Sequence, residues 1–456
     1  MANYYEAFDD GFKAGKKSGL AKGYDEGYAR GYAAAKSEQP PEPVVPPDGS
    51  AEHPYLIKTV ADLEQLRVDV ADGDCKEGVH FLQAADIDMS GNPWSGIGLM
   101  SSATPKYDPD PDHMFKGTYD GGGHVIDHLV LHCESTDTGK ANRYKALFRT
   151  AGRGATIKNL TVNVDGVDHW ESEDIMAAAF VGCTEGPLTI ENCTANGTLG
   201  TASQPLDNSA GVVCRIAVAN NSSPTTTLTN VTNNVDVFGI CKVGGIVAYA
   251  YGALNLSNVV NNGNMTRTAG SAPTADHYTR DDGVGGIVGY GHQGGAHVTY
   301  SFDGVKNAGA ISDDKTTYAY LTGQLVGKWA AMDMSSSGDI AVQDGAVPLA
   351  KACPITGQNS VMTGAPIFLG EVGADGCLHG VDGLENGKSY VYMVGSISET
   401  SGAAVAQPAY VLAAGATVVV DQRFGVPNIV PEAGASLDED HTLGDDKVRY
   451  TAAANV

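Results

Sequence analysis

Short apolar segments recur along the middle of the chain at nearly constant spacing. Each begins with an apolar pair that a small residue usually follows, and the first residues of successive pairs are 33, 32, 34, 41 and 38 positions apart. The segments are Leu147-Phe148, Phe180-Val181-Gly182, Val212-Val213, Ile246-Val247-Ala248, Ile287-Val288-Gly289 and Leu325-Val326-Gly327. A period near 33 residues, without long apolar stripes at helical spacing, predicts repeated short strands rather than paired helices.

An asparagine-bearing motif alternates with these apolar pairs. Its copies are Asn159-Leu-Thr-Val-Asn163, Asn192-Cys-Thr-Ala-Asn196, Asn230-Val-Thr-Asn-Asn234, Asn258-Val-Val-Asn-Asn262 and, more loosely, Gly304-Val-Lys-Asn-Ala308. If successive copies stack as coils, the asparagines form columns at the corners, where each amide can bond its neighbours above and below. The inward-facing column is then Leu160, Cys193, Val231, Val259 and Val305. Residues 115–350 are therefore expected to form a parallel β-solenoid with about three short strands per coil.

The segment before the repeats, residues 54–114, has the pattern of an N-terminal cap. Residues 59–68 place apolar side chains at helical spacing behind a capping Thr59, and residues 79–83 and 87–89 are predicted strands. The end coil of a solenoid exposes unpaired strand edges and an open core. A short amphipathic helix would cover that end.

Residues 1–36 carry a glycine at every fourth position. Interior glycines weaken an isolated helix by about 1 kcal/mol each, but they allow another backbone to approach closely. We interpret this segment as an anchoring helix that becomes ordered on docking to copies of itself or to a larger assembly, the alternative being a frayed tail. A proline-rich linker follows at residues 37–53. The anchoring glycines are Gly11, Gly15, Gly19, Gly23, Gly27 and Gly31.

The repeat pattern ends near Cys353, and residues 351–456 are expected to form a separate β domain. Strands are predicted near residues 365–370, 388–394, 410–412 and 416–421, separated by glycine-rich turns. The acidic residues 438–441 are interpreted as solvated surface.

Composition narrows the possible partners. Among 456 residues there are 58 glycines and only 18% charged residues, which suits turn-dense β structure. The formal net charge of −25 argues against nucleic acid and anionic membranes as partners. The sequence shows neither a membrane-spanning apolar run nor a secretory signal, so we expect assembly in a cytoplasm. The eight cysteines lack metal-type spacing, Cys193 is expected to be a small core residue, and no cofactor is expected.

Several motifs resemble those of the GLUG-repeat β-solenoid family of bacterial surface adhesins and phage structural proteins. The resemblance covers residues 54–330 and implies a right-handed solenoid with an adhesive or scaffolding role, without a family-wide catalytic set. It is carried by Thr59-Val-Ala-Asp-Leu-Glu-Gln-Leu, Ala85-Asp-Ile-Asp-Met-Ser-Gly, Phe115-Lys-Gly-Thr-Tyr-Asp-Gly-Gly-Gly-His-Val-Ile, Gly244-Gly-Ile-Val-Ala-Tyr and Gly285-Gly-Ile-Val-Gly-Tyr.

Two loops are candidate ligand sites. Asp108, Asp110 and Asp112 are candidate ligands of a hard cation such as Ca²⁺, the alternative being a solvated acidic loop. An insertion before Ile287 lengthens one coil, and loops that project from a solenoid often bind ligands. The candidate glycan-binding residues are Asp276, His277, Tyr278, Arg280 and Asp281 of this insertion, together with Tyr249 and Tyr290 as stacking groups; an ordinary polar loop is the alternative.

Parallel β-helices can carry glycosidases and polysaccharide lyases, so the carboxylates of the chain are candidates for enzymatic chemistry. Glycoside hydrolysis needs two carboxylates about 5 to 9.5 Å apart. The candidate pairs are Asp165 with Asp168, Glu171 with Asp174, and Asp281 with Asp282. His124 and His128 stand in the sequence as lone histidines without ligand-type partners.

Anchor, linker and rod in one chain predict a non-enzymatic fibre or spike of a bacteriophage virion, of the head or the tail. The N-terminus would bind other virion proteins, and the rest would contact a host surface glycan or protein, as a homotrimer. A bacterial surface adhesin is the alternative, and a polysaccharide depolymerase tailspike is the second alternative.

Overall fold

The computed structural model divides the chain into two compact units, residues 1–48 and 49–456. It describes residues 30, 46–101, 108–133, 143–168, 175–217, 225–268, 283–292, 299–313, 322–323, 325–330, 333–342, 367–372, 378–381, 383–394, 409–424, 426–444 and 447–454. The anchoring glycines of the first unit lie outside these residues, as does most of the proline-rich linker. The fold described below is that of the second unit.

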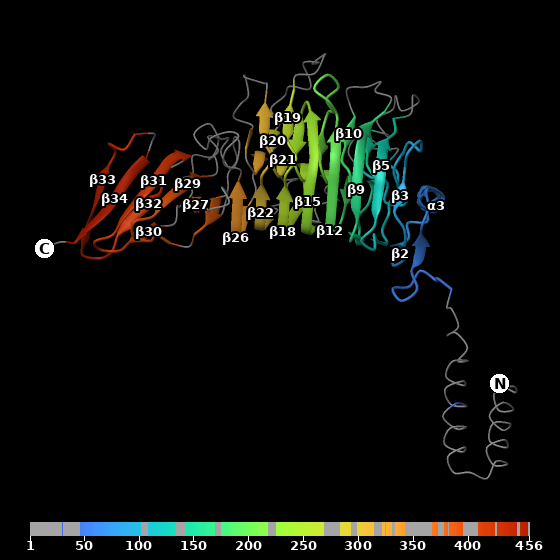
Figure 1. The fold of residues 1–456 in the computed structure, drawn as a ribbon, viewed down its shortest axis with the longest axis horizontal. Coiled ribbons are helices and arrows are strands. Elements are labelled where there is room, and N and C mark those ends of the chain that lie inside the picture. Colours follow the sequence, from blue (N-terminus) through green and yellow to red (C-terminus); the bar gives the residue numbers. More distant parts are fainter. Residues whose placement is uncertain are drawn as a thin grey trace, which may run out of the picture. The chain divides into compact units, whose positions relative to one another are not determined.

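Three parallel sheets make up most of the second unit (Figure 1). The main path of the largest, 14-stranded sheet is β1 (Tyr55–Ile57), β2 (His80–Gln83), β4 (Thr118–Asp120), β8 (Ala155–Lys158), β12 (Leu188–Leu199), β15 (Thr225–Gly239), β18 (Ala253–Asn261), β22 (Thr299–Asn307) and β26 (Asp333–Val342). Its other strands are β3 (Ile87–Asp88), β5 (Val125–Leu131), β9 (Thr161–Val167), β19 (Met265–Arg267) and β23 (Ile311–Asp313).

Two six-stranded sheets complete the coils. One contains β6 (Tyr144–Lys145), β10 (Met176–Ala177), β13 (Ser209–Ala210), β16 (Lys242–Gly244), β20 (Gly283–Gly285) and β24 (Thr322–Gly323). The other contains β7 (Phe148–Thr150), β11 (Val181–Glu185), β14 (Val213–Ala217), β17 (Val247–Ala250), β21 (Val288–His292) and β25 (Val326–Ala330). The chain visits the three sheets in turn and returns one rung further on, so the fold is all-β and β-helix-like, as expected.

The apolar pairs found in the sequence mark equivalent places on successive coils. Strand pairing aligns their second residues in one column, which is Phe148, Val181, Val213, Val247, Val288 and Val326. The inward column Leu160, Cys193, Val231, Val259 and Val305 is also confirmed, because each of these residues is at most 1% exposed. One continuous hydrophobic core therefore runs through the coils.

The predicted cap helix is present as α3 (Val60–Ala71). Thr59 and Asp62 form a reciprocal capping box, which satisfies backbone N–H groups that the first turn leaves open. Leu63, Leu66 and Val70 are buried in the same core as the coils. Strands β1 and β2 are hydrogen-bonded rungs of the large sheet, so the cap continues the coils directly.

Residues 367–454 form sheets of a different kind, with their own hydrophobic cluster. A six-stranded mixed sheet has the order β28 (Leu378–Gly380), β27 (Ile367–Val372), β29 (Ser389–Val394), β31 (Thr417–Phe424), β34 (Lys447–Ala454) and β33 (Ala435–Asp440). Strands β30 (Ala409–Leu412) and β32 (Asn428–Pro431) pair separately. The acidic residues Asp438 and Glu439 are exposed, as expected, and they lie on the edge strand β33.

Candidate functional site

Two exposed asparagine ladders cross the outer face of the large sheet. In the first, Asn258 donates from Nδ2 to Oδ1 of Asn230, Asn230 to Asn192, and Asn192 to Asn159, at 3.2, 2.9 and 3.1 Å. All four residues have φ of 52° or 53°, a left-handed conformation that asparagine tolerates better than most side chains. Gly304 takes the next place with φ of 60°, and its missing side chain ends this ladder.

The second ladder runs alongside the first on the same strands. Asn262 donates to Asn234, Asn234 to Asn196 and Asn196 to Asn163, at 2.8, 2.7 and 2.8 Å. Asn163 then donates to a carboxylate oxygen of Asp127 at 2.9 Å. The corner columns predicted from the sequence are thereby confirmed for both asparagine positions of the motif.

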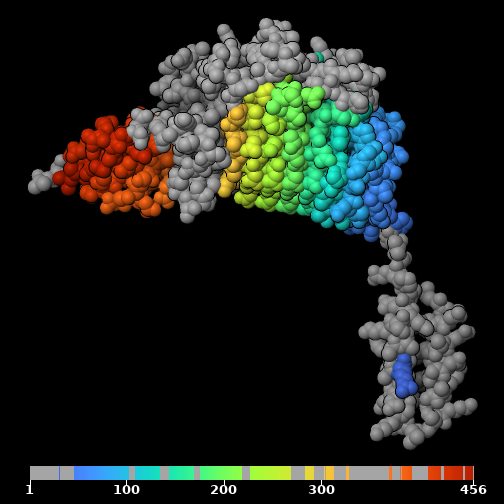
Figure 2. Space-filling model, turned by 45° about the horizontal axis from the view of Figure 1, so that its top comes forward, coloured from blue at the N-terminus to red at the C-terminus, as the bar shows by residue number. Residues whose placement is uncertain are grey.

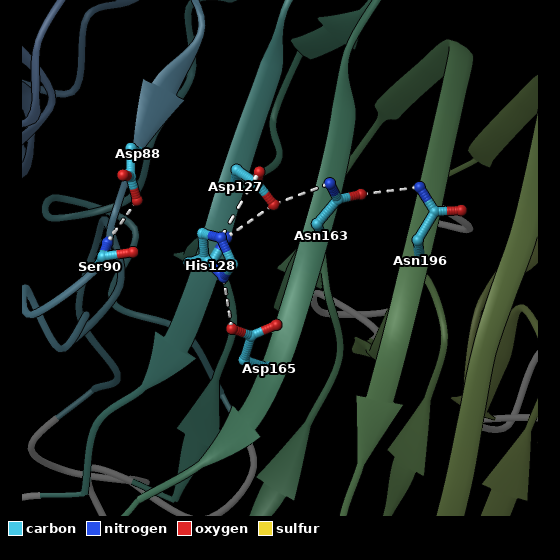
Figure 3. Close-up of polar contacts among 7 residues, drawn as sticks. All are labelled: Asp88, Ser90, Asp127, His128, Asn163, Asp165 and Asn196. Atoms are coloured by element: carbon cyan, nitrogen blue, oxygen red, sulfur yellow. Dashed lines mark hydrogen bonds and ion pairs between the residues drawn. The ribbon is translucent and has the colours of Figure 1, made fainter.

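An aspartate stands at the start of each ladder and fixes its direction. Asn159 donates to Asp120 at 2.9 Å. Asn163 donates to Asp127 at the same distance, as Figure 3 shows. An ionised carboxylate only accepts, so the first amide must turn its NH₂ group toward it, and each later amide must follow the same orientation. Burial opposes ionisation of Asp120, but hydrogen bonds from Asn159, Gly122 and Lys158 outweigh it and lower the pKa of this carboxyl.

A third ladder, which sequence reasoning missed, lies inside the coils. Asn233 donates to Asn261 at 2.7 Å and Asn261 to Asn307 at 2.8 Å, and all three are fully buried. Each amide also donates to the carbonyl two residues ahead, those of Val235, Gly263 and Gly309. The Asn-Asn pairs at 233–234 and 261–262 were the available signal, because neighbouring residues of a strand point to opposite faces.

Histidines bridge the coils next to the second ladder: His124 and His128, for which the sequence offered no ligand-type partners, each pair with an aspartate. His128 Nδ1 lies 2.9 Å from Asp165, and its Nε2 lies 3.8 Å from Asp127 (Figure 3). His124 pairs with Asp86 at 3.0 Å. The hydrogen bond to Asp165 and the charges of Asp127, Asp165 and Asp88 raise the pKa of His128.

Tyr249 and Tyr290, two of the tentative glycan contacts, are brought together on adjacent strands β17 and β21. Their rings stack with centroids 5.2 Å apart and an interplanar angle of 4°. The Arg215 guanidinium lies 5.1 Å from the Tyr249 centroid, and the Lys242 ammonium lies 5.2 Å from the same centroid. Tyr290 is only 3% exposed, so its ring serves mainly as a packing surface for its neighbours. Glycan stacking on this pair stays a prediction.

The remaining predicted site residues have different outcomes. Asp276, His277, Tyr278, Arg280 and Asp281 lie outside the described residues. The candidate cation ligands Asp108, Asp110 and Asp112 are described, but Asp110 pairs with His113 at 3.1 Å. Within the described part of the chain, no group of three or more histidine, cysteine or acidic side chains has an arrangement that could hold a metal ion.

Two candidate catalytic carboxylates, Asp165 and Asp168, form hydrogen bonds to histidines, and the thiols of Cys183 and Cys193 are buried. Asp165 and Asp168, one of the candidate hydrolytic pairs, bond separately to His128 and His132, at 2.9 Å in both cases. The other two candidate pairs lie outside the described residues. Burial raises the pKa of the Cys183 and Cys193 thiols to about 12, so neither is a nucleophile at neutral pH. Among the described residues, no helix is long and apolar enough to cross a membrane.

No family model matches the chain. Halomucin of Haloquadratum walsbyi is 33% identical over 158 residues, which cover 33% of this chain and 2% of halomucin. A provisionally named Gly-rich membrane protein of Evansella cellulosilytica is 27% identical over 143 residues, 31% of this chain and 14% of that protein. The chain thus corresponds to a small fraction of each relative's length.

The solved structures include a similar chain from Bacteroides ovatus, provisionally named an immunoglobulin A1 protease. It is 16% identical, with a TM-score of 0.44, and the match covers 70% of this chain and 83% of that one. A similarity of this size bears on neither the activity nor the ligands of the present chain.

Proposed function

We propose that this protein is a non-enzymatic fibre or spike of a bacteriophage virion and that its coils form a rigid rod. The proposal rests chiefly on the described coils, where one buried core and three amide ladders tie each rung to the next. Such an arrangement resists bending because the described rungs from Asp120 to Asn307 are held by backbone pairing, apolar contact and side-chain hydrogen bonds. The resemblance to GLUG-repeat proteins supports the same role and a right-handed coil.

The rest of the chain is assigned by extension of this proposal. The glycine-rich residues 1–36 would dock to other virion proteins, the proline-rich linker would space them from the rod, and the outer surface would meet the host. A homotrimer is the proposed assembly. Head and tail attachment are equally compatible with it.

Sedimentation tests the anchor and the assembly together. The full-length protein and a variant lacking residues 1–48 are compared by analytical ultracentrifugation, and antibodies against residues 49–456 are used to probe purified phage particles. We expect oligomers of the full-length protein, monomers or weaker association of the truncated one, and antibody signal on the particles. Monomers of both forms together with unlabelled particles would contradict the proposal.

A bacterial surface adhesin is the second candidate, and the name of one curated relative supports it. That relative is provisionally named a Gly-rich membrane protein. Immunogold labelling of the producing cells discriminates between the candidates. Labelling of the outer cell surface in the absence of phage particles would favour the adhesin.

A depolymerase stays the third candidate because the loop at residues 269–282 lies outside the described part. A reducing-end assay and an unsaturated-uronate assay on host polysaccharide would detect it. Activity that disappears on replacement of Asp281 and Asp282 would replace the non-enzymatic proposal.

A further inference from the structure

The outer face of β12, β15 and β18 is a regular array of uncharged polar side chains. Strand register aligns these residues in columns, and they alternate along each strand with buried neighbours such as Ile190 and Ala195. We call this array the amide–hydroxyl face. Its residues are Thr189, Glu191, Asn192, Thr194, Asn196, Thr227, Thr229, Asn230, Thr232, Asn234, Asn255, Ser257, Asn258, Val260 and Asn262.

The face is nearly neutral although the protein carries a net charge of −25. Glu191 is the single charged side chain among the residues of this array, and Asp236 faces outward further along β15, beyond the array. Charged residues occupy the same columns on the neighbouring coils, with Lys158 before Glu191 and Lys306 after Val260. Uncharged surface is therefore concentrated on three consecutive coils. Figure 2 shows the coils from blue to yellow as a continuous coloured surface.

The ladders hold the polar groups of this face in fixed positions. Each interior ladder amide on these strands uses one N–H and one acceptor site on its two neighbours, which leaves a second N–H and a second acceptor site for a ligand. Thr194 and Thr232 lie between the ladders, and within the described residues their hydroxyls have no hydrogen-bond partner. Rungs repeat at about 4.8 Å, and outward positions along a strand repeat at about 6.7 Å.

We propose that the amide–hydroxyl face binds a neutral, extended polysaccharide, which would be the surface contact of the proposed fibre or adhesin. Sugar hydroxyls donate and accept, and so do amides and threonine hydroxyls, whereas this face offers no cation for phosphate, sulfate or carboxylate. The strongly negative protein also repels polyanions. A protein partner would require an apolar patch at the centre of the contact, and Val260 alone does not provide one. Pre-organised side chains lower the entropic cost of binding.

Column composition provides a test in both directions. Thr194, Thr232 and Val260 form one column across the three strands, and Val260 is its member without a hydroxyl. Val260→Thr therefore adds a hydroxyl to the column. Thr232→Val removes one while the side chain keeps its shape. Binding of the full-length protein to dextran, mixed-linkage β-glucan and galactomannan is measured by isothermal titration. Polygalacturonate serves as the anionic probe, and Thr451→Val on β34 is the matched control.

One neutral hydrogen bond changes affinity by about two- to tenfold. We expect Thr232→Val to weaken binding to at least one neutral polysaccharide by that factor, Val260→Thr to strengthen it, and Thr451→Val to leave it unchanged. Equal melting temperatures exclude loss of fold as the cause. The gain from Val260→Thr cannot arise from misfolding.

Three results would overturn the proposal: no binding to any neutral polysaccharide of the panel, a preference for polygalacturonate, or equal affinities of all variants. Binding of the same protein preparations to whole host cells distinguishes a failure of the polysaccharide-binding proposal from a failure of the proposed fibre or adhesin function. Unchanged binding of both face variants to cells would leave the fibre or adhesin role intact and reject this face. If the unmodified protein does not bind host cells, the fibre or adhesin role itself is rejected.

Discussion

Replacement of Asn261 by leucine tests whether the buried ladder is a structural requirement of the coils. Asn261 receives a hydrogen bond from Asn233 at 2.7 Å and donates to Asn307 at 2.8 Å and to the Gly263 carbonyl at 3.0 Å. Leucine leaves one N–H of Asn233 and the Gly263 carbonyl buried without partners. Leucine has the same branching as asparagine and is somewhat larger, so it leaves no room for water to replace the lost bonds.

The expected cost follows from these contacts. Each orphaned buried group costs about 1 to 3 kcal/mol, so two give about 2 to 6 kcal/mol. Steric overlap adds to this cost. The leucine methyl groups would take the places of the Asn261 amide atoms, which lie 2.7 and 2.8 Å from the amides of Asn233 and Asn307, whereas methyl groups need about 3.5 to 4 Å. We therefore expect a lower urea midpoint and faster hydrogen exchange in β15 and β18.

The neighbouring residue is a matched control. Asn262 lies on the same chain segment but its side chain points outward and donates to Asn234, at 2.8 Å. After Asn262→Leu the freed groups are solvated, so a cost of roughly 0.5 to 1.5 kcal/mol is expected. If Asn261→Leu lowers the free energy of unfolding by less than about 1 kcal/mol, or by no more than Asn262→Leu does, then the reasoning is refuted.

Three further predictions concern the ladders, the histidines and the thiols. Asn230→Ala is expected to be less stable than Asn230→Gly by about 1 kcal/mol, because φ of 53° disfavours alanine; equal melting temperatures would contradict this. His128→Asn keeps a residue suited to the left-handed backbone but cannot titrate. Since the native pKa of His128 is raised, its stabilisation is present at pH 5 and is lost as the pH rises past that native value, so urea midpoints of the two proteins should converge by pH 9. Cys193, with a pKa of about 12 and 1% exposure, should resist iodoacetamide at pH 8 until the protein is unfolded.

The features repeated in every coil could be predicted from the sequence. The constant spacing aligned Asn192 with Asn230 and Cys193 with Val231, and the structure confirms both columns. The capping threonine Thr59 was recognisable because capping depends on residues three positions apart. These features are local or recur at nearly regular spacing, so composition and spacing suffice to find them.

Features that depend on contacts between particular coils could not be predicted in this way. The pairing of His128 with Asp165 joins residues 37 positions apart, and it requires the positive φ of His128 and the exact coil length. The burial of Asn261 beside the exposed Asn262 depends on which face of the strand turns inward. The mixed sheet of residues 367–454 has no period from which to infer its strand order.

The carboxylates at the start of the ladders limit how such a chain can lengthen. Asp120 and Asp127 accept a hydrogen bond from the first amide of each exposed ladder, and a carboxylate cannot donate to an amide on the preceding coil. Each exposed ladder therefore has a defined first member. Any coil duplicated between Asn159 and Asn258 would inherit the orientation of its neighbours without further change. Gene duplication within this region could therefore vary the reach of the molecule by whole coils while preserving the chemistry of its surface.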